Sequence, residues 1–188
     1  MADPDPRRRL ELLPAGGVSL QLLSELGRAL DHALGTRHRI ASPFKVLSAW
    51  RSGDAVRCDA VLDALLARVD AEGRVGPEIV MMVVTSAPLV ALDGSRVFGQ
   101  AAVGGGCAVI GLGALDGGSR CDETTLAERA RKVAMHEAAH AAGLEHCADP
   151  TCVMYPARDI ADVDRKAIGF CARCSGDLAH ATLDAARG

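Results

Sequence analysis

The sequence predicts an α/β (α+β) fold, in which a mixed, twisted sheet of four strands and two long helices precede a small C-terminal lobe. Two long stretches have apolar residues at helical spacing, and short apolar runs typical of buried strands alternate with them. A cluster of histidines and cysteines follows near the C-terminus. We expect a flexible tail over residues 1–17 and a single domain over 18–188, with subdomains 18–143 and 144–188.

The first half of the chain is expected to alternate helix and strand. Residues 18–34 have the apolar spacing of a helix, and residues 40–47 resemble a strand that Pro43 confines to an edge or a bulge. Residues 54–70 form a second amphipathic helix, and residues 79–84 form a buried strand. This strand–helix–strand order predicts a parallel pair joined by a right-handed crossover.

A hairpin is expected next. Residues 96–103 and 107–112 have strand composition and are joined by Gly104-Gly105-Gly106. Three glycines could cradle a phosphate, but no helix begins directly after them and no GK[ST] sequence follows. We therefore interpret the three glycines as a tight hairpin turn.

The longest helix is expected after this hairpin. Thr125-Leu126-Ala127-Glu128 matches a capping box with Thr125 as the N-cap, and the helix should run to Ala142. Its C-terminal part is rich in alanine and apolar nearly all round, which predicts a buried helix. Shorter helices are expected over residues 162–170 and 175–186.

Residues 136–146, HEAAHAAGLEH, are the most informative segment of the chain. On a helix, His136 and His140 lie on one face and can direct ring nitrogens to the same point. Glu137 lies next to them, where it can hold a metal-bound water without ligating the metal. Gly143 tolerates positive φ, so the helix can end and the chain can return His146 as a third ligand. Three protein ligands leave one position open, as in catalytic zinc sites.

A cysteine cluster follows directly. Four thiols in two short pairs have the spacing of a closed, structural zinc site, formed by Cys147, Cys152, Cys171 and Cys174. The three remaining cysteines have no such spacing, and we expect buried small side chains at Cys58, Cys107 and Cys121, whose role stays open.

The composition excludes several classes of partner. The chain has 188 residues with a formal net charge of −3 and only 3% aromatic residues, so we expect no nucleic-acid partner. No apolar run approaches the length of a membrane span, and no apolar h-region follows the first residues, so we expect neither a membrane partner nor a secretory signal. The cysteines show no disulfide framework, which favours a reducing cytoplasm. We expect a monomer.

The complete pattern is HExxHxxGxxHC, four residues, CxM, a spacer and CxxC, and it resembles that of the archaemetzincins. Sixteen residues separate Met154 from Cys171, close to the family's usual spacer. The segments Phe98-Gly99-Gln100-Ala101, Cys107-Ala108-Val109-Ile110 and Asp164-Arg165-Lys166 are also similar to the family's. The resemblance extends over residues 55–180, and its strong motifs lie within 136–174.

This resemblance implies a metzincin-like zincin fold, two zinc ions and metallopeptidase chemistry. Met154 would be the methionine of the Met-turn below the catalytic metal. An edge strand of the sheet would line the cleft and pair with an extended substrate, and residues 96–103 are our choice by position.

We therefore expect a zinc-dependent metallopeptidase with a peptide or protein substrate, in which Glu137 is the general base for a zinc-activated water. Tyr155 is a candidate for transition-state stabilisation, although simple packing would also explain it. An aminopeptidase would need an acidic group for the substrate's α-amine, with Glu145 and Asp149 as candidates, and an endopeptidase remains the alternative. Two other classes stay open: a zinc-stabilised peptide-binding or regulatory module, and a zinc amidase acting on non-peptide substrates. Glu137 favours an enzyme, because a binding module would usually lack it.

Overall fold

A five-stranded mixed sheet forms the centre of the molecule. The structure, a computed structural model, describes residues 9–72, 79–118 and 121–185. The strand order is β2-β1-β5-β9-β8, with bounds Arg37–Ile40, Arg9–Ala15, Ile79–Thr85, Cys107–Gly111 and Gly99–Ala102. All neighbouring pairs are parallel except β8 and β9, so the sheet ends in one antiparallel edge strand.

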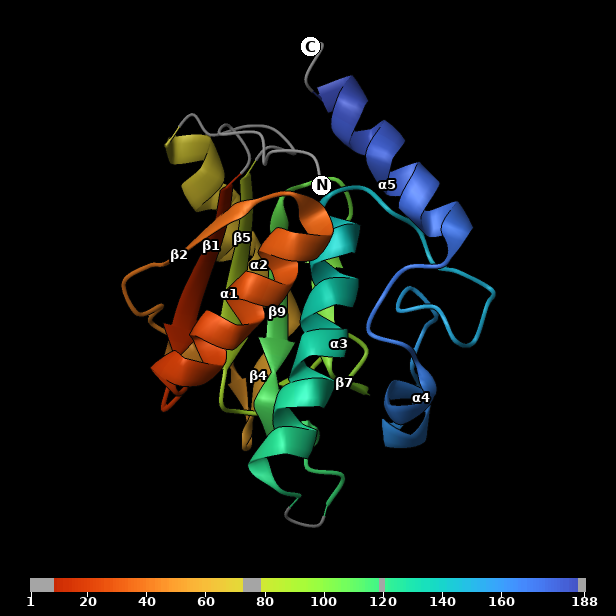
Figure 1. The fold of residues 1–188 in the computed structure, drawn as a ribbon. Coiled ribbons are helices and arrows are strands. Elements are labelled where there is room, and N and C mark those ends of the chain that lie inside the picture. Colours follow the sequence, from red (N-terminus) through yellow and green to blue (C-terminus); the bar gives the residue numbers. More distant parts are fainter. Residues whose placement is uncertain (1–8, 73–78, 119–120, 186–188) are drawn as a thin grey trace.

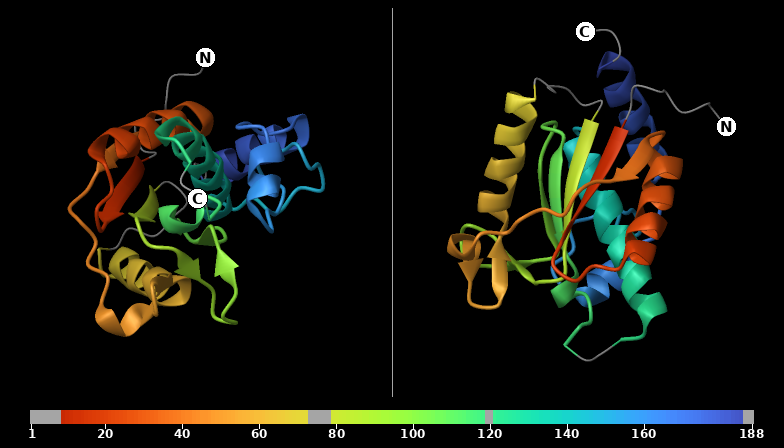
Figure 2. Two further views of the ribbon diagram at one scale, coloured as in Figure 1. Left: turned by 90° about the horizontal axis from the view of Figure 1, so that it is seen from below. Right: turned by 90° about the vertical axis from the view of Figure 1, so that its left-hand side faces the viewer.

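Helices cover both faces of this sheet. Helices α1 (Leu20–Leu34) and α3 (Glu123–Ala141) lie on one face, and α2 (Cys58–Ala71) lies on the other (Figures 1 and 2). Alternate residues along each strand point to opposite faces. In β5, Met82 therefore joins the core below α1 and α3, whereas Met81 joins the core below α2.

A small second sheet leads the chain to the edge strand β8. Its strand order is β3-β4-β6-β7, with bounds Arg51–Ser52, Ala55–Arg57, Leu89–Val90 and Arg96–Val97. Short 3-10 turns are formed by Ser48–Trp50 and Leu112–Ala114. Only Phe98 separates β7 from β8, so the end of the small sheet fixes the start of the edge strand.

The C-terminal part lies beside α3, on the side away from α1 (Figure 1). It contains α4 (Ile160–Arg165), α5 (Ala172–Ala185) and the loops before each of them. Arg129 of α3 holds Asp164 of α4 through two hydrogen bonds of 2.7 Å. Within the described ranges, no helix is long and apolar enough to cross a membrane.

The mixed α/β class is confirmed, but the N-terminal tail predicted over residues 1–17 is wrong for residues 9–15. These residues form β1, between β2 and β5, and Leu10, Leu12 and Leu13 are fully buried. The arginines before Leu10 and the proline within the strand conceal the apolar pattern. The carbonyl oxygen of Pro14 accepts the Phe44 N–H beyond the end of β2. The nitrogen of Pro14 lies on the same side of β1, where no strand pairs with it, so the missing N–H is tolerated. The sheet therefore has five strands, not four.

The predicted strand over residues 40–47 and its pairing with 79–84 are also wrong. Strand β2 ends at Ile40, and β1 separates it from β5, so the first parallel crossover is β1-α1-β2. The start of the long helix differs as well. Asp122, not Thr125, is the N-cap, and its carboxylate accepts the Thr125 N–H at 2.8 Å.

Candidate metal centre

Helix α3 brings two of the predicted histidines and the glutamate to one site. His136 and His140 are one helical turn apart, and both are buried, as is Glu137. His146 is exposed, and its ring centroid lies 4.7 Å from that of His140 and 5.3 Å from that of His136. One ring nitrogen from each histidine lies within 4.8 Å of the other two. The structure thus brings together the three histidines that the sequence indicates.

Backbone carbonyls orient two of these rings. Nδ1 of His136 lies 2.8 Å from the Val153 oxygen, and Nδ1 of His140 lies 2.6 Å from the Leu144 oxygen. Because a carbonyl oxygen only accepts, both Nδ1 atoms must donate a proton. The unprotonated Nε2 atoms then face each other at 3.1 Å. Two lone pairs at this distance repel each other unless a cation or a proton lies between them.

The turn after α3 creates one of these acceptors. Gly143 has φ 104°, and the Leu144 N–H returns to the Ala139 oxygen at 2.9 Å, as in a Schellman motif. This reversal places the Leu144 carbonyl beside His140 and directs the chain toward His146. The hairpin glycines also contribute, because Gly104 donates its N–H to the His140 oxygen at 2.9 Å. Strands β8 and β9 pair antiparallel on either side of these glycines, so the predicted hairpin turn is confirmed, and it caps the C-terminal end of α3.

The histidine group fits a zinc ion. Two nitrogens bound to one tetrahedral zinc lie about 3.3 Å apart, given zinc–nitrogen distances of about 2.0–2.1 Å. The observed Nε2–Nε2 distance of 3.1 Å between His136 and His140 is close to this value. Burial, with Lys166 and His140 adding to it, lowers the pKa of His136 to about 2, so its ring is neutral at neutral pH. A neutral imidazole is the form that binds metal.

Glu137 is held close to the edge strand. A Cβ atom on Gly99 of β8 would lie 2.6 Å from Cγ of Glu137, so only glycine fits there. Burial raises the pKa of Glu137 to about 8, and the charge of Lys166 opposes this shift. Sequence analysis assigned no role to Gly99 beyond the family resemblance of its segment, although a glycine inside a strand often marks a close approach.

A cavity of about 390 Å³ opens onto the metal centre. Its walls are β7 and β8, the C-terminal half of α3, the segment around His146, residues 156–158 and Lys166. Strand β8 is an edge strand of the sheet, as expected for residues 96–103. Oε1 of Gln100 on this strand is buried without a hydrogen-bond partner in the described structure, so a polar group is available on this wall.

Lys166 is the main cavity residue to which the sequence assigned no role. It is buried, and its Nζ donates to the Val153 oxygen at 3.2 Å. Burial lowers the pKa of Lys166 to about 8. Two signals were available: the family resemblance of Asp164-Arg165-Lys166, and composition, since lysine is rare among the 21 basic residues of the chain and occurs at Lys45, Lys132 and Lys166.

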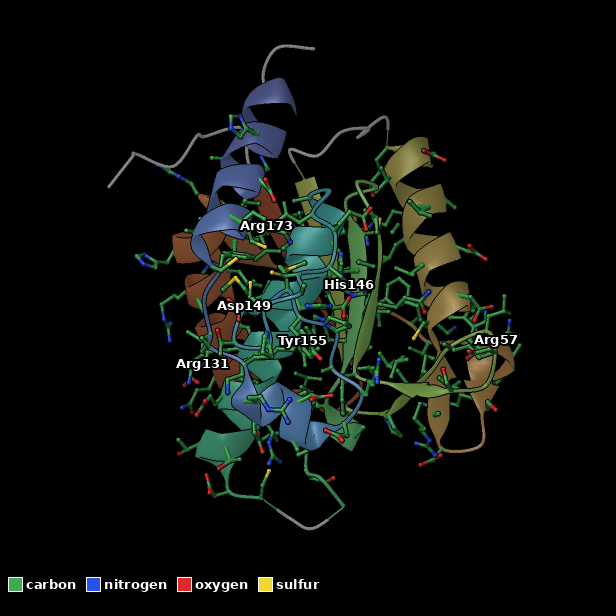
Figure 3. The ribbon with its side chains drawn as sticks, turned by 90° about the vertical axis from the view of Figure 1, so that its right-hand side faces the viewer. Arg57, Arg131, His146, Asp149, Tyr155 and Arg173 are labelled. Carbon is green, nitrogen blue, oxygen red and sulfur yellow. The ribbon has the colours of Figure 1, made fainter. Side chains whose placement is uncertain are left out.

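The four predicted cysteines also come together. Their sulfurs lie within 4.8 Å of one another, and Sγ of Cys147 is 3.8 Å from Sγ of Cys171. A disulfide is about 2.05 Å long, whereas two sulfurs on a tetrahedral zinc lie about 3.8 Å apart. A hydrogen bond from the Cys174 backbone N–H is the main reason why the pKa of Cys171 is lowered to about 7. This lowered pKa favours the thiolate. Arg173 lies beside the group of sulfurs (Figure 3).

One short segment connects the two groups. The Met154 oxygen accepts the Cys147 N–H at 2.9 Å, and the preceding Val153 oxygen accepts from His136. Cys147 directly follows His146 in the chain. The segment Val153-Met154 therefore holds His136 of α3 and also holds Cys147, the residue that follows His146.

Two other candidates lie away from the cavity. Tyr155 is half-buried and is not among the residues that line the cavity. Asp149 does not line the cavity either, and its carboxylate accepts from the Thr151 N–H at 2.9 Å and hydroxyl at 2.8 Å. Glu145 does line the cavity and remains a candidate for an α-amine contact.

Fold and site together define the class as a metallopeptidase of the metzincin type. The structure of the archaemetzincin from Methanopyrus kandleri superposes with a TM-score of 0.79 at 26% identity, covering 96% of this chain and 98% of the other. That of the archaemetzincin from Archaeoglobus fulgidus gives 0.74 at 25% identity, covering 89% and 98%.

Sequence comparisons agree. The archaemetzincin of Pyrococcus furiosus is 30% identical over 174 residues, which are 89% of this chain and 91% of that protein. The sequence match to the Archaeoglobus fulgidus protein is 36% identical over 104 residues and spans 55% of this chain and 62% of that protein. The model of peptidase family M54 matches residues 54–180. The chain belongs to peptidase family M54, the archaemetzincins.

Proposed function

We propose that the chain hydrolyses peptide bonds with a zinc ion held by His136, His140 and His146, and with Glu137 as the general base. The observation that carries this proposal is the pair of Nε2 atoms 3.1 Å apart, both directed to one point by carbonyl bonds at Nδ1. Bound zinc would supply Lewis acidity and lower the pKa of a water toward about 7.

The chain's own residues would move the proton. Glu137 is next to His136 in sequence and lines the same cavity, so it can accept a proton from a water there and pass it to the leaving amine. Gly99 leaves just enough room for this carboxylate, which restricts its position. Lys166 opposes the effect of burial and favours the ionised form that a base requires.

Strand β8 would bind the substrate. It is an edge strand that lines the cavity, so its free backbone groups can pair with an extended peptide. The sequence alternatives of aminopeptidase and endopeptidase both fit such pairing, and Glu145 is the acidic group that an aminopeptidase would use.

A second, structural zinc would be held by Cys147, Cys152, Cys171 and Cys174. Its role would be to fix the C-terminal part, residues 144–188, against α3, with Met154 as the methionine of the Met-turn. All seven cysteines are free of disulfides, which is compatible with the proposed cytoplasmic location.

The test is Glu137→Gln in zinc-loaded protein, assayed on a peptide library by mass spectrometry. We expect zinc content and melting temperature close to those of the wild type, with hydrolysis reduced about a hundred-fold or more. Unchanged hydrolysis in this variant would remove Glu137 from the mechanism. Wild-type protein that binds zinc but cleaves no peptide would contradict the proposed function.

A further inference from the structure

The protein contains two equally buried lysines with different partners. Lys132 and Lys166 are each 4% exposed. Lys132 forms an ion pair with Glu128 at 2.9 Å and also donates to the Asp164 oxygen at 3.0 Å. For Lys166, by contrast, the described residues offer a single hydrogen bond, to the Val153 oxygen, and no carboxylate within 4.0 Å. The carboxylates of Glu137 and Asp162 act on this ammonium only from beyond 4.0 Å, so a closer anion from outside the chain would stabilise the buried charge further.

Lys166 reaches the cavity at a defined place along α3. Its neighbour Asp164 is held by Arg129 and Lys132, which lie one to two turns before His136. The cavity wall includes Val133 at this level of the helix, and Arg158 also lines it. The histidines and Glu145 form the wall further along the helix. Nζ of Lys166 and Nδ1 of His136 contact the same Val153 oxygen, so this cation lies in the cavity wall beside the metal-binding histidines.

A peptide at the metal centre would therefore bring a group next to its scissile amide close to Lys166. Successive Cα atoms are about 3.8 Å apart. Arg96 also lines the cavity, but Asp54 already pairs with its guanidinium at 2.8 Å. Lys166 and Arg158 are thus the cations left for a ligand.

We propose that Lys166, assisted by Arg158 at the rim, binds a carboxylate of the substrate next to the scissile bond and so selects acidic peptides. The carboxylate can belong to an aspartate or glutamate side chain or to the free C-terminus of the peptide, since both present the same group. This inference rests on the proposed peptidase function and names the substrate class of that site.

A purely internal role for Lys166 predicts something different. If the ammonium served only to keep Glu137 ionised, its removal would slow the cleavage of all peptides by the same factor. If it binds a substrate carboxylate, its removal affects acidic peptides far more than neutral ones. The ratio between the two kinds of peptide therefore separates the roles, and it also cancels a general loss of activity.

The experiment uses zinc-loaded full-length protein and peptide pairs that differ only in Glu against Gln on either side of the scissile bond. A second pair compares a free with an amidated C-terminus. We expect kcat/KM to be about ten-fold or more higher for the carboxylate member of one pair, since charge-assisted bonds to a buried cation have this magnitude. The pair that shows the preference identifies the source of the carboxylate.

Lys166→Met should reduce this ratio to about one, because methionine keeps most of the volume and removes the charge. Lys132→Met is the matched control, since it removes an equally buried ammonium outside the cavity. It should preserve the ratio even where it lowers the melting temperature. Equal loss of the ratio in both variants would overturn the proposal.

Binding to Glu137→Gln protein, measured by calorimetry, keeps the proposal testable without turnover and without a folded Lys166 variant. The acidic peptide should bind about ten-fold or more tightly than its neutral partner. Equal affinities, or no binding of either peptide, would overturn the proposal. Hydrolysis of neutral and acidic peptides at equal rates would contradict the inference alone, whereas absence of any hydrolysis would contradict the proposed function.

Discussion

His136 and Lys166 share one acceptor, the carbonyl oxygen of Val153. The imidazole Nδ1 lies 2.8 Å from this oxygen and the ammonium Nζ lies 3.2 Å from it. Val153 thus orients His136, a candidate metal ligand on α3, and also holds the ammonium of Lys166, which follows α4. The next residue, Met154, accepts the Cys147 N–H with its carbonyl oxygen. The group of three histidines and the group of four cysteines are therefore connected through the segment Val153-Met154.

Gly99→Ala should impair the base while leaving the metal ligands intact. The new Cβ would lie 2.6 Å from Cγ of Glu137 and would displace this side chain. We expect hydrolysis to fall about a hundred-fold, with unchanged zinc content, measured by peptide assay and mass spectrometry. Gly176→Ala on α5 is the control, because its Cβ would meet no atom within 4 Å. Normal activity in Gly99→Ala would show that the base is not restricted by β8.

Gly143→Ala should weaken both folding and zinc binding. At φ 104° an alanine is strained, which costs about 1–2 kcal/mol of unfolding free energy and disturbs the turn that leads to His146. Gly35→Ala is a matched control, because Gly35 also ends a helix at positive φ with free space around it. Denaturant unfolding should show similar losses, but only Gly143→Ala should lower zinc affinity in a chelator competition. Equal zinc affinities in the two variants would contradict the role of this turn.

The paired replacement of Cys171 and Cys174 by serine should remove one of two bound zinc ions. Without the second pair of thiolates the cluster cannot close, so α5 should lose its attachment. Zinc per chain should fall by about half in elemental analysis, and amide exchange should increase over residues 160–185. Cys121→Ser is the control outside the cluster. Full zinc content together with unchanged exchange in the double variant would exclude a structural site.

The stability of the zinc-free protein should be highest in mildly acidic solution. The pKa of Glu137 is raised by burial to about 8 from an ordinary 4.5, so between these values the folded state holds a proton that the unfolded chain lacks. Stability from this group therefore falls as pH rises toward 8. The pKa of His136 is lowered by burial to about 2 from 6.5, so the unfolded chain takes up the extra proton and stability falls as pH drops below 6.5.

Thermal melts of chelator-treated protein between pH 4 and pH 8.5 would show this maximum. In zinc-free Glu137→Gln the decline from pH 6 to pH 8 should disappear, whereas the decline on the acid side should remain. An identical decline in variant and wild type would show that another group causes it.

Local patterns account for what the sequence predicted well. The i, i+4 spacing of His136 and His140, the glycine at 143 and the paired cysteines each specify a position within one or two turns of chain, so the grouping of these candidate ligands could be predicted in advance. Where the sequence prediction was wrong, contacts with segments distant in the sequence determine the structure. Strand β1 was missed because Pro14 is acceptable only where no strand pairs with its nitrogen.

The contributions of Lys166 and Gly99 depend on contacts between distant segments. Lys166 lines the cavity from the segment after α4, and α3 holds this segment through Arg129, which is 35 residues before its partner Asp164. Gly99 is required only because Glu137 packs against β8. Beyond the residue types and the family resemblance of their segments, neither contact has a local signature, so the position of Lys166 beside the histidines became visible only in three dimensions.

The most direct test is anomalous diffraction at the zinc edge from crystals of protein purified without chelator. The account predicts one peak bounded by Nε2 of His136, Nε2 of His140 and a ring nitrogen of His146, and a second peak among the four cysteine sulfurs. Absence of a peak among the histidines, with their rings turned away from one another, would contradict it.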